Sequence, residues 1–303
     1  MRAVPNLCER RRAAGREAAE LGAYPTPAAR TGMRGAAAAE GSVRAMAEFV
    51  TLELPEGEGA RGVAVLRIAR PPMNPLNVQV VREVAEAAAA VAADPRVAAL
   101  VVYGDERVFS AGDDVAELAA LNADQAQAMA ADVQSALGCL AKVPQPTVAA
   151  ISGYCLGAGL ELALGADRRV IGDNVKLGLP QIHAGLIPLA GIRRLSLLIG
   201  PGPAKDLVYT GRFVEPDEAR ALGLVDEVVA PDDVFAAALR WAERFTDGPA
   251  RALAAAKAVF EAGPHGLDRA RTEWAGLFAT EDRRIGTESY VADGPGSAAF
   301  VGR

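Results

Sequence analysis

Apolar and polar residues alternate over two early segments of the chain, residues 49–54 and 62–68. This period of two predicts strands that bury one face. Residues 97–103 and 147–151 are instead continuous apolar runs, which are typical of strands buried on both faces of a sheet. These four segments supply the β part of the predicted fold.

Segments with a period near 3.6 residues lie between the strands and predict helices. Asn77 is a suitable N-cap for a helix that runs to about Ala93. Asn122 or Asp124 can cap a second long helix, which Pro144 is expected to end. The alternation of strands with helices indicates an α/β fold.

The last part of the chain is mostly helical in pattern, with helices predicted at 231–246, 249–262 and 267–292. We therefore divide the chain after its first 45 residues into an α/β core, residues 46–246, and a C-terminal helical region, residues 247–303.

Residues 1–45 differ in composition from the rest of the chain. They contain thirteen Ala, eight Arg and four Glu, and they show no sustained period. The apolar core of a secretion signal is missing, and four glutamates are unusual for a transit peptide. We expect a disordered extension or a wrongly assigned start, with Met46 as the true beginning.

The overall composition excludes several classes of protein. The chain has 303 residues, 51% of them hydrophobic and 23% charged, so it can bury a sizeable core. Its net charge of −6 argues against nonspecific nucleic-acid binding, and no run of about 18 apolar residues suggests a membrane span. Three Cys and two His are too few and too scattered for a zinc site or a disulfide framework. We expect a metal-free protein of the reducing cytoplasm.

Two glycine-containing loops, residues 109–115 and 152–162, are the best candidates for chemistry. Each follows a predicted buried strand and leads into a helix, and Gly112, Gly157 and Gly159 let the backbone approach a ligand closely. Helix N-termini present N–H groups without acceptors, so two that converge can bind an oxyanion. Taken alone, the loops fit ordinary strand-to-helix turns equally well.

Several segments of the chain, taken in order, form a more specific pattern. They are Arg70–Asn77, Phe109–Asp114, Pro146–Tyr154, Gly157–Glu161, Leu179–Pro188, Gly223–Glu227 and Phe278–Arg284. In this series the chain resembles the enoyl-CoA hydratase/isomerase (crotonase) superfamily over nearly all of residues 47–303. The resemblance implies a crotonase-like spiral of ββα units and a C-terminal helical oligomerisation region that forms trimers or hexamers. It also implies an acyl-CoA thioester as ligand, with no cofactor besides the coenzyme A that is part of the substrate.

The resemblance assigns roles to individual residues as well. The thioester oxygen is expected between the backbone N–H groups of Ala111 and Ala158, which form an oxyanion hole. Glu161, three residues after Ala158, matches the first of the two catalytic glutamates of the hydratases. The second falls at Gln181, whose amide cannot exchange a proton but can orient a water or a carbonyl group. Other residues expected to contact the substrate are Ala69, Met73, Leu76, Gly112, Asp113, Asp114, Val115, Tyr154 and Gly157.

Several further residues have simpler interpretations. Asp114 can cap the helix that follows it, and Cys155 is expected to be a small buried filler. On a strand, His183 would share a face with Gln181 and could act as a base, but a surface histidine is the simpler interpretation. Basic residues of the last helices could meet the phosphates of coenzyme A or simply face solvent; these are Lys257, Arg269, Arg283 and Arg284.

The leading hypothesis is an enoyl-CoA hydratase of fatty-acid metabolism, which adds water to a 2-enoyl-CoA thioester through an enolate. Because Gln181 replaces the second glutamate, two alternatives stay open: a catalytically weakened acyl-CoA-binding protein of the same fold, and an isomerase that works with Glu161 alone. A nucleotide-binding oxidoreductase is a weaker hypothesis, since Leu162 stands where a dinucleotide motif needs its third glycine.

Overall fold

The structure, a computed structural model, describes residues 42–55 and 61–303, which belong to one compact unit of the chain. Within this part of the chain the central sheet has seven strands. Their order across the sheet is β1 (Ser42–Met46), β2 (Val50–Leu54), β3 (Gly62–Ile68), β5 (Val97–Tyr103), β7 (Thr147–Ile151), β9 (Arg168–Gly172) and β12 (Glu227–Val229). β1, β2 and β3 pair antiparallel, and each later pair in this sheet is parallel.

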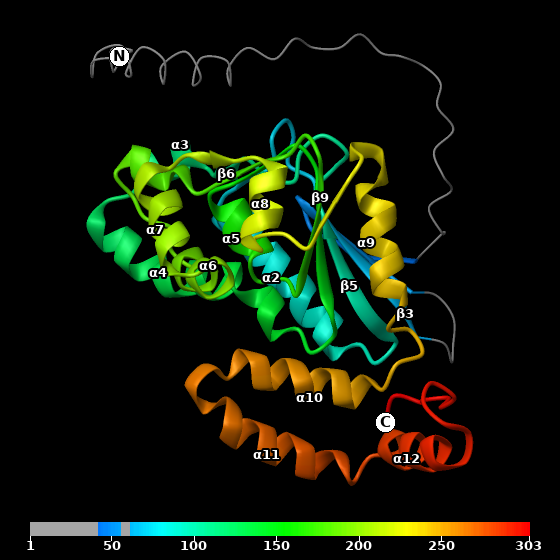
Figure 1. Cartoon of the computed structure of the whole chain (residues 1–303). Helices are drawn as coiled ribbons and strands as arrows, with labels where there is room; N and C mark the ends of the chain where they lie inside the picture. Colours follow the sequence, from blue (N-terminus) through cyan, green and yellow to red (C-terminus); the bar gives the residue numbers. More distant parts are fainter. Residues whose placement is uncertain (1–41, 56–60) are drawn as a thin grey trace, which may run out of the picture. The chain divides into compact units, whose positions relative to one another are not determined.

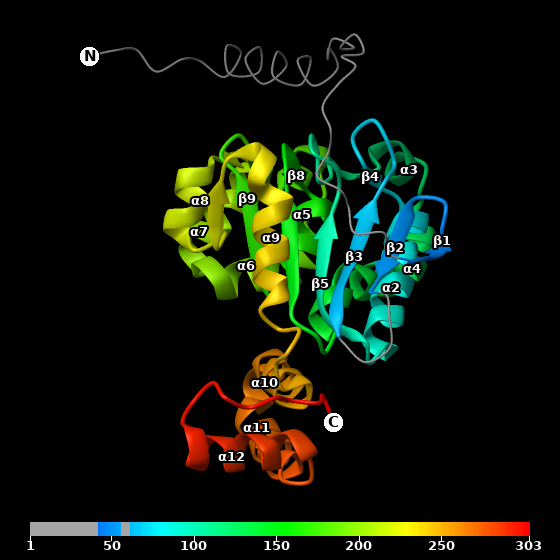
Figure 2. The ribbon, with the colours of Figure 1, turned by 90° about the vertical axis from the view of Figure 1, so that its right-hand side faces the viewer.

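Helices cover both faces of this sheet (Figures 1 and 2). α9 (Val234–Glu243) lies on one face, whereas α2 (Val78–Ala93) and α5 (Ala158–Ala163) lie on the other. β5 is therefore buried on both sides: Ala99 and Val101 belong to the cluster beneath α9, and Leu100 and Val102 belong to the opposite cluster. This explains why the strand shows no alternation of apolar and polar residues.

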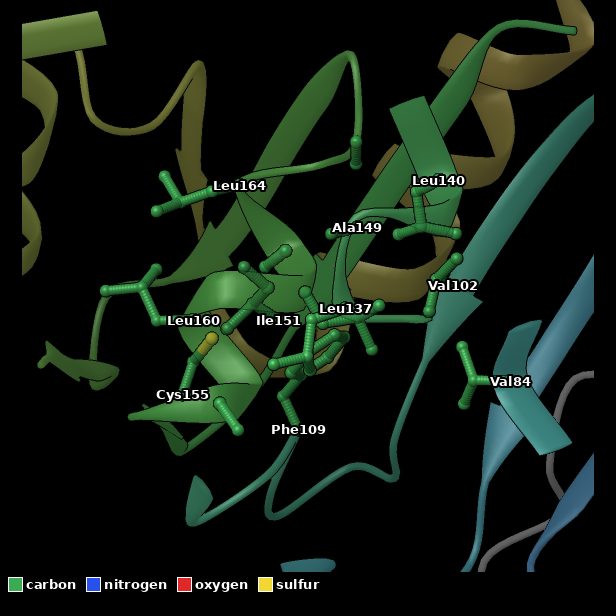
Figure 3. Close-up of a cluster of buried hydrophobic side chains, with 14 of the residues drawn as sticks. Val84, Val102, Phe109, Leu137, Leu140, Ala149, Ile151, Cys155, Leu160 and Leu164 are labelled. Carbon is green, nitrogen blue, oxygen red and sulfur yellow. The ribbon is translucent and has the colours of Figure 1, made fainter. Parts of the chain in front are cut away.

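The larger hydrophobic core lies between the sheet and the helices α2 and α5. Val102 of β5, Ile151 of β7 and Leu160 of α5 belong to it, together with Phe109 (Figure 3). Phe109 is fully buried there, which contributes roughly 1.5–3 kcal/mol to stability. Because Phe109 begins the first candidate loop, packing in the core fixes the position of that loop.

The remaining elements surround the central sheet. Two smaller groups of strands are β11 (Phe213–Val214) with β10 (Lys176–Gly178) and β8 (Tyr154–Leu156), and β4 (Pro75–Leu76) with β6 (Gly112–Asp113). The other α-helices are α3 (Val115–Ala119), α4 (Ala123–Leu137), α6 (Gly191–Ile199), α7 (Pro201–Thr210), α8 (Pro216–Leu222), α10 (Ala250–Glu261), α11 (Gly266–Leu277) and α12 (Glu281–Asp293). Among the helices that the structure describes, none combines the length and the apolar character needed to span a bilayer.

The periodic patterns predicted many of these elements correctly. The strands expected at 62–68, 97–103 and 147–151 are confirmed. Asn77 caps α2 as expected, since its side-chain oxygen accepts the N–H of Val80 at 2.9 Å.

One predicted helix end is wrong, one predicted helix is divided in two, and α6, α7 and α8 were not predicted at all. α4 ends at Leu137 and not at Pro144, because a short 3₁₀ turn (Cys139–Lys142) follows it. The single helix expected at 267–292 is two helices. Thr280 separates them, since its hydroxyl accepts a backbone N–H of the next turn at 3.1 Å and so caps a new helix.

A buried lysine fixes α10 to the core. Lys257 is only 8% exposed, and its ammonium group donates to the Asp167 carboxylate at 2.7 Å and to the carbonyls of Leu140 (3.2 Å) and Gln145 (3.1 Å). For Lys257 this overturns both interpretations from the sequence, a phosphate contact and a solvated helix face. The ion pair instead ties the C-terminal helices, which lie beyond one end of the sheet (Figure 1), to the core.

The expected start of the α/β core does not match the strands that the structure describes. β1 pairs with β2, and Met46 is its last residue. The expected boundary between residues 45 and 46 therefore falls inside a strand. The rest of the expected extension, residues 1–41, lies outside the described residues.

Candidate active site

Backbone pairing brings the two candidate loops side by side. The Ser110 N–H donates to the Tyr154 carbonyl at 2.9 Å, and the Leu156 N–H donates to the Ser110 carbonyl at 3.0 Å. β8 pairs in turn with β10, where the Gly157 N–H donates to the Gly178 carbonyl at 2.9 Å. Both loops and the segment that follows β10 therefore meet at one place.

Gly112 makes this close approach possible. Its φ of +99° is one that L side chains rarely adopt, and a Cβ there would lie 2.5 Å from the Leu156 carbonyl oxygen. The neighbouring Ser110 hydroxyl donates to the Asn74 carbonyl at 2.7 Å and accepts the Gly112 N–H at 3.0 Å. The first loop is thus held between the Asn74 segment and β8.

Glu161 is a buried carboxyl group in α5, one turn after the N-terminal residue of that helix. Only 2% of the residue is exposed. Its Oε2 accepts the N–H groups of Ala190 and Gly191, the latter at 2.6 Å. Gly191 begins α6, and such N-terminal N–H groups have no acceptor within their own helix and favour a negative charge. The N-terminus of α6 therefore holds the carboxylate of Glu161.

Burial raises the pKa of Glu161 to about 7. The hydrogen bonds from Ala190 and Gly191 oppose this effect, and the negative charge of Asp113 adds to it. A carboxyl group with a pKa near 7 is present in both protonation states at neutral pH. Such a group is suited to general acid–base catalysis.

The Gln181 side chain joins two carboxyl groups. Its Nε2 donates to Glu161 Oε1 at 2.9 Å and to Asp113 Oδ2 at 3.1 Å. This orientation of the amide is assigned from the hydrogen-bond pattern, because an ionised carboxylate can only accept. Gln181 Oε1 is buried and has no hydrogen-bond partner in the part of the chain that the structure describes. It is an acceptor available to a donor from solvent or substrate.

Both N–H groups predicted to form an oxyanion hole have acceptors within the chain. The Ala158 N–H donates to Asp113 Oδ2 at 3.2 Å, and the Ala111 N–H donates to the Met73 carbonyl at 2.9 Å. A carbonyl oxygen that binds here must replace these acceptors or share the N–H groups with them. Of the predicted residues, direct hydrogen bonds therefore link Ala158, Asp113, Gln181 and Glu161.

The other predicted substrate contacts differ in their surroundings. Asp114 pairs with Arg70 at 2.7 Å and accepts the Glu117 N–H at 3.2 Å, which confirms that it caps α3. Leu76 is 5% exposed and packs in the hydrophobic core. Ala69 and Val115 are exposed, whereas Met73 and Tyr154 are half-buried.

The simpler interpretations hold for the remaining two candidates. His183 is exposed, and it lies in a 3₁₀ turn (Pro180–Ala184) and not on a strand, so the expected shared face with Gln181 is wrong. Cys155 is fully buried in the core (Figure 3). Burial raises the pKa of its thiol, which disfavours the reactive thiolate.

The sequence interpretation missed the residues that hold Glu161. Ala190 and Gly191 lie about 30 positions away, at the start of a helix that was not predicted. A signal was present, since Ile192, Leu195 and Ile199 have helical spacing after a glycine-rich stretch. Pattern alone could place the helix, but it could not show which side chain its N-terminus meets.

The family model for enoyl-CoA hydratase/isomerase matches residues 58–293. The chain belongs to the enoyl-CoA hydratase/isomerase family. Its curated relatives include the probable enoyl-CoA hydratase EchA17 of Mycobacterium tuberculosis, which is 52% identical over 222 residues, covering 72% of this chain and 85% of the relative. The probable enoyl-CoA hydratase echA8 of Mycobacterium bovis is 37% identical over 236 residues, covering 76% of this chain and 91% of the relative.

Solved structures of this family have the same fold. An enoyl-CoA hydratase from Bacillus anthracis matches with a TM-score of 0.76 at 27% identity, covering 84% of this chain and all of that chain (100%). An enoyl-CoA hydratase from Mycobacterium smegmatis matches with a TM-score of 0.74 at 25% identity, covering 81% and 97%. These likenesses confirm the crotonase-like α/β fold class with its helical C-terminal region. The enoyl-CoA hydratase/isomerase family is a family of enzymes, in agreement with the buried carboxyl group of the site.

Proposed function

We propose that this protein adds water to the double bond of a 2-enoyl-CoA thioester. The observation that carries the proposal is Glu161, a 2%-exposed carboxyl group whose pKa is raised to about 7 and which lies one turn from the Ala158 amide. Two relatives that bear the name probable enoyl-CoA hydratase support the choice of reaction.

The thioester oxygen would bind to the Ala158 and Ala111 N–H groups. The thioester oxygen would replace Asp113 Oδ2 as the acceptor of the Ala158 N–H. It would share the Ala111 N–H with the Met73 carbonyl. Attack by water at C3 moves charge onto this oxygen as an enolate, which the two amides stabilise more than they stabilise the starting carbonyl. One such donor is worth roughly 10²–10³ in rate.

Glu161 would accept a proton from the attacking water, because it is the buried carboxyl group of α5 and lies in the first turn of that helix, after Ala158. The N–H groups of Ala190 and Gly191 keep this carboxylate oriented, and the Gln181 amide holds its other oxygen. Gln181 Oε1 would accept a hydrogen bond from the same water and so orient it. The reaction needs no cofactor, since coenzyme A enters with the substrate.

The proposal extends to self-association as a trimer or hexamer through α10, α11 and α12. These helices expose large apolar side chains, with Phe260 85%, Trp274 66% and Val291 86% exposed in the single chain. Exposed apolar groups of this size are typical of a protein interface. Light scattering of the purified protein measures the oligomer directly.

The test is hydration of crotonyl-CoA, followed by the loss of enoyl absorbance, in wild type and Glu161→Gln. The substitution keeps the shape of the side chain and removes its exchangeable proton, so we expect a loss of about 10²–10⁴ in kcat. Affinity for butyryl-CoA, which cannot react, should be retained. Glu86→Gln on the exposed face of α2 is the matched control and should leave the rate unchanged.

Two outcomes would contradict the proposal. If wild type binds butyryl-CoA but hydrates no enoyl-CoA of any chain length, the protein is an acyl-CoA-binding member of the family. If wild type hydrates crotonyl-CoA and Glu161→Gln does so equally fast, another group must take the proton from water.

A further inference from the structure

Asp113 lies in the first loop, directly after Gly112, and its carboxylate reaches across to the second loop. Oδ2 accepts the Ala158 N–H at 3.2 Å and the Gln181 amide at 3.1 Å. The same Gln181 nitrogen donates to Glu161 Oε1 at 2.9 Å. One amide group therefore bridges two carboxyl groups that come from different loops.

The second loop is shaped to admit the Asp113 carboxylate. A Cβ at position 157 would lie 2.6 Å from Asp113 Oδ2 and 3.3 Å from Gln181 Nε2. Gly157 also has a φ of +49°, which L side chains other than Asn and Asp rarely adopt. The space that Asp113 occupies thus depends on the absence of a side chain at Gly157.

Among the described residues, no basic side chain forms an ion pair with Asp113 or Glu161. Arg70 pairs with the neighbouring Asp114 instead. Burial raises the pKa of Asp113 as it raises that of Glu161. Glu161 is buried and Asp113 is half-buried. Two such carboxyl groups repel each other when both are ionised, which favours a state in which they hold one proton between them.

We propose that Asp113 supplies the second carboxyl group of the acid–base pair, from the first loop, and that Gln181 holds it beside Glu161. The proposal rests on the hydratase function above. It assigns to position 113 the role that the resemblance placed at position 181, where this chain has an amide.

The hydration step balances with this pair. A lone pair of water forms the bond to C3 while Glu161 takes one proton of that water. The electrons of the double bond pass onto the thioester oxygen and return to C2, which takes a proton from Asp113. Glu161 is then protonated and Asp113 ionised, and exchange with solvent restores the starting state.

The position of Asp113 suits this role. Its Oδ2 accepts the Ala158 N–H that is proposed to bind the thioester oxygen, so the arriving carbonyl must displace it from that N–H. C2 is two bonds from that oxygen, which leaves Asp113 beside the carbon that must be protonated. The bond from Gln181 keeps the side chain from swinging into solvent.

The experiment measures kcat/KM for crotonyl-CoA across pH, together with butyryl-CoA affinity, in wild type, Asp113→Asn and Asp113→Ser. Wild type should give a bell-shaped profile, because one member of the pair must be ionised and the other protonated. Asp113→Asn should lower kcat about 10²–10⁴-fold and leave a single limb in the profile, with butyryl-CoA affinity retained. Asp113→Ser, which keeps a small polar side chain without a carboxyl group, should show the same loss and provides the test if the asparagine variant does not fold. The exposed Asp132→Asn on α4 is the matched control.

An exchange of the two side chains sharpens the test. In Asp113→Asn/Gln181→Glu a second carboxyl group returns, now at position 181, which contacts both residue 113 and Glu161 in wild type, so activity should recover from that of Asp113→Asn. Gln181→Glu alone should slow wild type, because it removes the bridging donor and adds a third carboxyl group.

Full activity with both limbs in Asp113→Asn would overturn the assignment of Asp113 and leave the hydratase function standing. Failure of the double variant to recover, with butyryl-CoA binding intact, would also overturn it. A wild type that hydrates no enoyl-CoA would overturn the hydratase function itself, and this assignment with it.

Discussion

The molecule buries charged side chains in two places, one with an opposite charge beside it and one without. In α10, the Lys257 ammonium group pairs with the Asp167 carboxylate at 2.7 Å. In the active site, Glu161 and Asp113 accept hydrogen bonds from an amide and from backbone N–H groups, and no cation of the described part of the chain pairs with them. Burial lowers the pKa of Lys257 and the Asp167 charge opposes that shift, whereas burial raises the pKa of Glu161 to about 7 with only hydrogen bonds to oppose it.

The difference separates a structural role from a chemical one. A buried lysine paired with an opposite charge serves to hold two elements together. A carboxyl group without a cation changes its protonation state near neutral pH, as an acid–base catalyst must. Both sites are buried, so the presence or absence of a counter-charge decides what each can do.

The largest expected effect on stability is at the paired site. Lys257→Met should lower the free energy of unfolding by about 3 kcal/mol, at the low end of the range for breaking a buried pair. The value is low because Asp167 is partly exposed and keeps the N–H and hydroxyl of Thr147. Urea unfolding measures the change, and hydration of crotonyl-CoA by the folded variant should stay at the wild-type rate.

Arg194→Met is the matched control for this prediction. Arg194 pairs with Glu261 at 2.8 Å, but both side chains are about a third exposed (30% and 35%). Such a pair is worth at most about 1 kcal/mol. If Arg194→Met costs as much as Lys257→Met, the buried pair has no special part in fixing α10.

At the uncompensated site the expected effect is on the pH dependence of stability. The folded-state pKa of Glu161, about 7, lies above its ordinary value of 4.5. Folding therefore disfavours the ionised form of Glu161. The contribution of the protonated side chain to the free energy of unfolding is complete below pH 4.5 and is lost as the pH rises to about 7. Relative to Glu161→Gln, wild type should lose about 3 kcal/mol over that interval. Urea unfolding of both proteins measures this. If their difference in free energy of unfolding stays constant from pH 4.5 to 7.5, the prediction is wrong.

The sequence predicted the parts of the molecule that depend on local pattern. The alternation at 62–68, the apolar run at 97–103 and the Asn77 cap were all found, because each depends on neighbouring residues. Glu161 and Gln181 were placed by their motifs, and the structure brings them to within hydrogen-bond distance.

The contacts that define the chemistry could not be predicted in this way. Asp113 and Gln181 are 68 positions apart, and neither shows a local pattern that points to the other. Lys257 occupies a position in a helical pattern that suits a solvated side chain equally well, and only packing against the core reveals its partner. The carboxylate–amide–carboxylate arrangement is therefore a property of the fold that no single segment encodes.

An infrared titration tests the central claim most directly, namely that the buried carboxyl pair holds a proton at neutral pH. Difference spectra of wild type against Glu161→Gln, collected from pH 5 to 9, isolate the C=O stretch of the protonated carboxyl group. The account predicts a protonated-carboxyl band that disappears with a midpoint near pH 7. In Asp113→Asn this midpoint should move to lower pH, because the neighbouring negative charge is gone. A wild-type spectrum with no such band above pH 5 would contradict the account, since Glu161 would then be an ordinary ionised carboxylate.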